Sequence, residues 1–103
     1  MRCMVKFWIP VSEGNELVQT GKIGEVFKSL MDDFKPESVY FFPDEGVRSG
    51  FMILNVGDQS EFIKVSESFW FGLRAEITVT PVMNGEDLEK GLDGIDGLLK
   101  RYV

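Results

Sequence analysis

The chain has 103 residues, which is enough for one domain with one hydrophobic core, and its formal net charge of −6 argues against nucleic acid or an anionic membrane as a partner. Its single cysteine excludes an intrachain disulfide and any cysteine-rich zinc or iron–sulfur site, and its lack of histidine excludes histidine-ligated metal or haem and catalysis by serine–histidine or cysteine–histidine pairs. We therefore expect one domain over residues 1–103, with no cofactor and no metal ion.

The first residues alternate in a way that is typical of a strand over residues 2–9. One face of this strand is apolar and would hold Cys3, Val5, Phe7 and Ile9. The other face is mixed and would hold Met4, Lys6 and Trp8. Because Lys6 interrupts the apolar stretch and Pro10 ends it, we expect neither a signal peptide nor a membrane segment, and hence a cytoplasmic protein.

From about residue 16 to residue 34 the spacing of apolar residues becomes helical. The predicted inner stripe consists of Ile23, Phe27, Leu30 and Phe34. Ser12 or Asn15 would cap this region, and Pro36 would end it. Because Gly21 interrupts the pattern, residues 16–20 are predicted as either a separate short helix or a loop.

Residues 38–43 and 48–56 predict two strands that are apolar on both faces. Between them, Asp44, Glu45 and Gly46 predict a three-residue hairpin loop with Gly46 in the left-handed conformation.

Asp58 and Glu61 have the spacing of a capping box and predict the start of a second helix, which would end at Gly72. Its inner stripe would be Phe62, Val65, Ser66 and Phe69. Residues 73–80 then predict a fourth strand, with its polar side formed by Arg74, Glu76, Thr78 and Thr80.

The last segment predicts one C-terminal helix that Asn84 caps. We expect it to pack through Leu88, Leu92, Ile95 and Leu99. Glycine recurs beside this stripe at Gly91, Gly94 and Gly97. If Gly94 is exposed in that helix, Gly94→Ala should stabilise it by up to about 1 kcal/mol. The alternative is a frayed tail.

The predicted order β-α-β-β-α-β, followed by a helix, is that of an α+β, ferredoxin-like fold with a four-stranded antiparallel sheet and both helices on one face. The uncovered face of such a sheet is normally polar, but here the strands carry aromatic residues on both faces. Since soluble monomers rarely expose such a patch, we expect a homodimer through this sheet face.

Four short motifs carry a resemblance to a known group: Tyr40-Phe41, Asp44-Glu45-Gly46-Val47-Arg48-Ser49-Gly50, Phe69-Trp70-Phe71 and Pro81-Val82-Met83. With these motifs the chain resembles the dimeric α+β barrels, and within them a family of small bacterial proteins of unknown function. The resemblance implies the fold and not one activity, since the barrel group includes cofactor-free monooxygenases, haem-degrading enzymes, lactone isomerases and ligand-binding regulatory domains.

Seven residues are candidates for a ligand-binding site: Lys6, Trp8, Tyr40, Asn55, Trp70, Arg74 and Glu76. Most of them should share the mixed sheet face, where aromatic and polar groups together suit a small apolar or aromatic ligand. The alternatives are a Lys6–Glu76 ion pair with interface packing, and a core position for Trp70. Arg48 would clamp an anionic group, or else be solvated or pair with Asp44 or Glu45.

We therefore expect a homodimeric small-molecule-binding or interaction protein without catalytic machinery, and no catalytic residue is assigned. The alternative is a cofactor-free monooxygenase- or isomerase-like enzyme that acts on a small aromatic substrate in the sheet cavity. In that case Lys6, Tyr40 or Glu76 would transfer protons and Trp8 would stack on the substrate.

Overall fold

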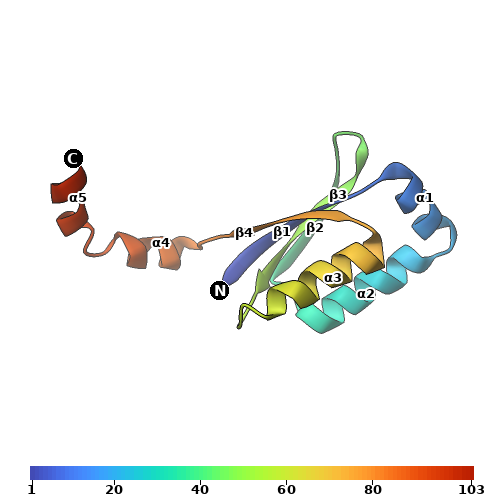
Figure 1. Cartoon of the computed structure of the whole chain (residues 1–103), viewed down its shortest axis with the longest axis horizontal. Coiled ribbons are helices and arrows are strands. Elements are labelled where there is room, and N and C mark those ends of the chain that lie inside the picture. The colour runs from blue at the N-terminus through green and yellow to red at the C-terminus, as the bar shows by residue number, and fades with distance from the viewer.

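The computed structural model describes all residues, 1–103, and shows an α+β chain with one four-stranded antiparallel sheet and five helices (Figure 1). The strands are β1 (Arg2–Ile9), β2 (Ser38–Asp44), β3 (Val47–Asn55) and β4 (Glu76–Pro81). The helices are α1 (Val11–Gln19), α2 (Lys22–Phe34), α3 (Glu61–Leu73), α4 (Gly85–Leu92) and α5 (Asp96–Tyr102). The strands lie in the order β2-β3-β1-β4, which is compatible with the predicted ferredoxin-like fold.

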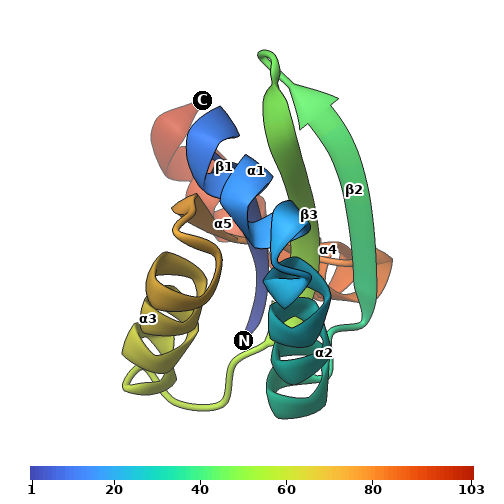
Figure 2. The same cartoon turned by 90° about the vertical axis from the view of Figure 1, so that its right-hand side faces the viewer.

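Helices α2 and α3 lie side by side on one face of the sheet (Figure 2). The core forms between them and the apolar side of β1, where Phe7 is 1% exposed and its ring packs 5.5 Å from that of Phe69 and 5.8 Å from that of Phe27, measured between centroids. The alternation predicted for residues 2–9 is confirmed, because Cys3, Val5, Phe7 and Ile9 are all buried.

The region before α2 forms a separate helix. α1 begins directly after Pro10, with no side-chain cap, so the predicted capping by Ser12 or Asn15 is wrong. Proline suits this place because its missing N–H would have no partner in the first turn of a helix. Gly21, at φ +75°, separates α1 from α2, because a left-handed residue cannot continue a right-handed helix.

The β2–β3 hairpin has a two-residue turn instead of the predicted three-residue loop. Asp44 pairs with Val47, and the two residues between them, Glu45 and Gly46, both have positive φ. A turn of this kind matches the right-handed twist of the strands that it joins. The left-handed conformation predicted for Gly46 is confirmed.

Helix α3 continues past Gly72, where the sequence predicted its end. Leu73 remains helical and fully buried, and Arg74, at φ +52°, ends the helix. The fourth strand therefore begins only at Glu76.

The C-terminal segment, residues 82–103, extends away from the sheet and is called the arm below (Figure 1). The predicted cap at Asn84 is confirmed, and Asp87 completes a capping box with it. The single predicted helix is wrong, because Gly94, at φ +77°, separates α4 from α5. The predicted packing is also absent, since Leu88, Leu92 and Leu99 are each about half exposed. None of the helices combines the length and the apolar character needed to cross a membrane.

Candidate functional site

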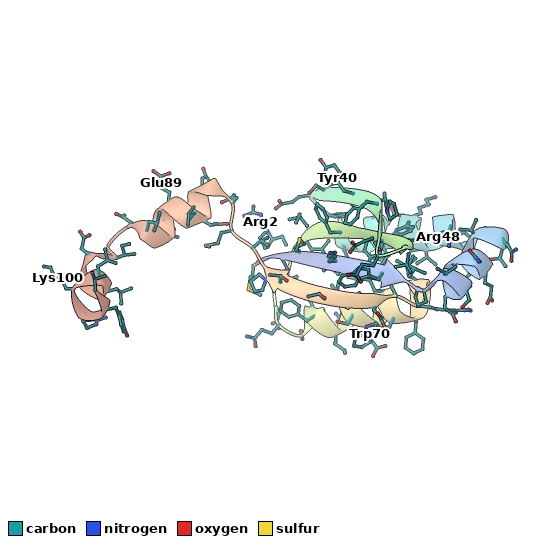
Figure 3. The ribbon with its side chains drawn as sticks, turned by 90° about the horizontal axis from the view of Figure 1, so that it is seen from above. Arg2, Tyr40, Arg48, Trp70, Glu89 and Lys100 are labelled. Atoms are coloured by element: carbon teal, nitrogen blue, oxygen red, sulfur yellow. The ribbon has the colours of Figure 1, made fainter.

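No helix covers the sheet face opposite α2 and α3, which we call the open face (Figures 1 and 3). Paired residues of antiparallel strands share a face, so the register identifies its members. Its apolar members are Met4, Trp8, Tyr40, Phe42, Phe51 and Ile53. Its polar members are Arg2, Lys6, Ser38, Asp44, Ser49, Asn55, Glu76, Thr78 and Thr80. Tyr40, labelled in Figure 3, is 60% exposed and its ring lies 5.5 Å from that of Phe51.

Side chains of β1 and β2 meet in a polar cluster of Lys6, Trp8 and Asp44. The Nζ of Lys6 lies 3.1 Å from a carboxylate oxygen of Asp44 and 4.9 Å from the centre of the Trp8 ring. The indole Nε1 of Trp8 donates a hydrogen bond of 3.0 Å to the same carboxylate oxygen. The bond from Trp8, followed by that from Lys6, lowers the pKa of Asp44 below its ordinary value of 3.8. The cluster thus holds a carboxylate in its ionised form beside an aromatic surface.

Of the other residues predicted on this face, Glu76 lies beside the cluster without an ion pair to Lys6, and Asn55 lies away from the cluster. Glu76 pairs in register with Trp8 and is exposed, but Lys6 forms its ion pair with Asp44 and not with Glu76. Asn55 pairs in register with Arg2 at the opposite end of β1, where its side chain accepts a hydrogen bond from the N-terminal amine of Met1. The predicted Lys6–Glu76 ion pair is therefore wrong.

Arg74 lies outside the open face, contrary to expectation, and Trp70 lies on α3. Trp70 is 44% exposed on α3, so it is neither a core residue nor a neighbour of the cluster (Figure 3). Arg74 ends α3 and binds Glu13 and Glu16 of α1, at 2.8 and 3.1 Å. These two hydrogen bonds raise the pKa of the Arg74 guanidinium. The continuation of α3 to Leu73 explains the displacement, because it makes Arg74 the C-cap of α3 instead of a residue of β4.

A second candidate site is a groove of about 620 Å³ on the helix-covered side, between the β2–β3 hairpin and helices α1 and α2. Its apolar walls include Phe7, Ile9, Val11, Ile23, Phe27 and Phe41. The rings of Phe27 and Phe41 meet edge to face at 5.0 Å, and yet Phe41 remains 55% exposed. The groove exists because β2 is the edge strand of the sheet, and the helices do not fully cover the side of β2 that faces them.

Arg48 lies in this groove, near α1 (Figure 3). Its Nη1 donates a hydrogen bond of 3.1 Å to the side-chain oxygen of Asn15. It pairs with neither Asp44 nor Glu45, which were its predicted partners. It is the only charged residue that lines the groove. Sequence reasoning identified Arg48 as a possible anion clamp but missed the groove. The available signal was Phe41, an aromatic residue at a sheet edge that faces the helices.

No set of three or more Cys, Asp or Glu side chains lies close enough together to hold a metal ion. Comparison of the chain with protein-family models and with curated proteins finds no match. The fold and the two sites described above therefore carry the functional argument.

Proposed function

We propose that this protein is a homodimer whose two open faces pack against each other, as in a dimeric α+β barrel, and that it serves in small-molecule binding or interaction. The observation that carries the proposal is the open face itself. It holds Trp8, Tyr40, Phe42 and Phe51, with no helix over them. A second copy of the chain presents a surface of the same shape and the same apolar character.

The free energy available from this face is large enough for association. Burial of about 500 Å² of apolar surface per subunit is worth on the order of 12 kcal/mol before the costs of association, at roughly 25 cal/mol per Å². The arm does not compete for the face within its own chain, because it extends away from the sheet (Figure 1). Tyr40, with 60% of its surface exposed, has the most to gain among the aromatic residues of this face.

In such a dimer the cluster of Lys6, Trp8 and Asp44 would lie between the two sheets. A small apolar or aromatic molecule would stack on Trp8 and contact the ion pair beside it. We favour binding over catalysis, because Lys6, one of the predicted proton-transfer residues, is engaged by Asp44.

Light scattering after size-exclusion chromatography tests the dimer directly. At micromolar concentration the wild-type chain should have about twice its monomer mass of 11.7 kDa. Tyr40→Glu should shift the mass towards that of the monomer, because it would place a charge in the interface. The matched control is Phe71→Glu, since Phe71 is 83% exposed on α3, and this variant should remain dimeric. A monomeric wild type, or a dimer that Tyr40→Glu leaves intact, contradicts the proposal.

The binding role is tested by NMR with benzyl alcohol as a neutral aromatic probe. The indole N–H resonance of Trp8 should shift on titration, while that of Trp70, on the outer surface of α3, should not. Equal shifts of both indoles, or none, would contradict binding at the open face.

A further inference from the structure

We propose that the groove between the β2–β3 hairpin and helices α1 and α2 binds an amphipathic carboxylate, that is, a small carboxylic acid with an apolar or aromatic body. The groove lies on the opposite side of the sheet from the open face, so this second site deepens the binding role proposed above without depending on the dimer.

The walls of the groove select an apolar body. Phe27 and Phe41 contribute aromatic surface to it, and Ile23 adds an aliphatic surface. A volume of about 620 Å³ lies within the range of pockets that hold small molecules. The exposed part of Phe41 is apolar surface that a ligand would remove from water, which is the main source of binding free energy in such a site.

Arg48 selects the charge of the ligand. In a chain with seventeen acidic residues, Arg2 and Arg74 each bind two carboxylates, but Arg48 binds none. Its one side-chain partner is Asn15, so most of its five N–H donors remain free. A guanidinium matches a carboxylate with two parallel hydrogen bonds, and no acidic side chain of the groove competes for it.

The position of Arg48 is set by α1. An added Cβ at Gly14 would stand 2.7 Å from Nη1 of Arg48, so the guanidinium rests directly on this glycine. Asn15, the next residue of α1, holds the same nitrogen. The helix therefore orients the guanidinium at the end of an apolar groove, where a carboxylate group would bind.

The experiment is a titration of the full-length protein, followed by NMR of the backbone amides, with 2-naphthoate and with its methyl ester as the uncharged match. With 2-naphthoate, the amides of residues 46–49 and of Phe41 should shift. The ester should bind at least about tenfold more weakly, because it cannot form charge-assisted hydrogen bonds with Arg48. Absence of shifts at the groove, or equal affinity for acid and ester, overturns the proposal.

Matched variants separate the two parts of the site. Arg48→Gln should weaken 2-naphthoate binding by about tenfold or more, whereas Arg101→Gln, in the arm, should not. Phe41→Ala should weaken binding, whereas Tyr40→Ala, the adjacent residue on the opposite face, should leave affinity unchanged whatever it does to the mass of the protein. Gly14→Ala, which displaces the guanidinium but keeps its charge, should also weaken binding. Wild-type affinity in Arg48→Gln contradicts the proposal even if the protein is a dimer.

Discussion

The indole of Trp8 in β1 is hydrogen-bonded to the carboxylate of Asp44 at the end of β2, although β3 lies between these two strands. Ser49, which pairs with Trp8 from β3, is only 4% exposed, so the bond spans a residue that is shielded from water on the otherwise open face. The bond therefore fastens the end of the hairpin to the centre of the sheet. It also makes the stability of the fold depend on the ionisation of the Asp44 carboxylate.

We expect Asp44→Asn to make the stability of the protein less sensitive to acid. The pKa of Asp44 in the folded protein lies below 3.8, chiefly because of the hydrogen bond from Trp8. A carboxylate with a lowered pKa contributes stability that is fully present above its unfolded-state pKa and is lost as the pH falls through its folded-state pKa. The urea midpoint of the wild type should thus fall below about pH 4, and more steeply than that of Asp44→Asn.

The control is Asp32→Asn, because Asp32 is exposed on α2 and forms no ion pair. This variant should retain the acid sensitivity of the wild type. The indole N–H resonance of Trp8 should report the titration of Asp44 directly, with a midpoint below 3.8. A midpoint at or above this value would show that the hydrogen bond does not form in solution.

Gly94→Ala should reduce the helical content of the arm, which reverses the expectation from sequence. Gly94 is exposed, but its φ of +77° is a conformation that costs alanine roughly 1–2 kcal/mol. Gly91 provides the matched control, because it lies within α4 with open space around it, so Gly91→Ala should favour the helix by about 1 kcal/mol. Circular dichroism at 222 nm measures both. A gain of helix in both variants would indicate one continuous helix.

Gly50→Ala should destabilise the domain by about 1–3 kcal/mol. An added Cβ at Gly50 would stand 2.5 Å from the carbonyl oxygen of Tyr40 and 2.6 Å from the ring of Phe7, and both are held by the sheet and core. Gly24→Ala is the control, because Gly24 lies in α2 with nothing within 4 Å, and it should stabilise the protein by about 1 kcal/mol. Urea unfolding measures both values. Equal effects of the two substitutions would contradict the close approach at Gly50.

The thiol of Cys3 should react only when the domain unfolds. Cys3 is fully buried in β1, between β3 and β4, which agrees with its predicted place on the apolar face of the first strand. Labelling with a disulfide reagent should therefore follow the global unfolding rate and accelerate with urea. A Ser60→Cys variant should also react at once at its second, exposed thiol. Immediate reaction of Cys3 in native protein would contradict its burial.

The sequence by itself determined the strands and helices whose buried residues recur at the regular spacing of a strand or a helix. Phe7 and Ile9 alternate with Lys6 and Trp8, and this alternation alone specified both faces of β1. The aromatic open face was predictable for the same reason. Burial in a strand or helix depends on spacing along the chain, and spacing is visible in the sequence.

Only the tertiary structure decided where the elements end and what meets between them. Because Leu73 is buried in the core, α3 continues past Gly72. Arg74 therefore ends α3 and binds glutamates of α1, instead of lying in the sheet as the sequence predicted. The groove beside Arg48 joins residues from α1, α2 and the hairpin, which are distant in sequence. Such contacts depend on how the helices pack across the sheet. Packing joins the surfaces of segments that are far apart in the sequence, so no local sequence pattern specifies it.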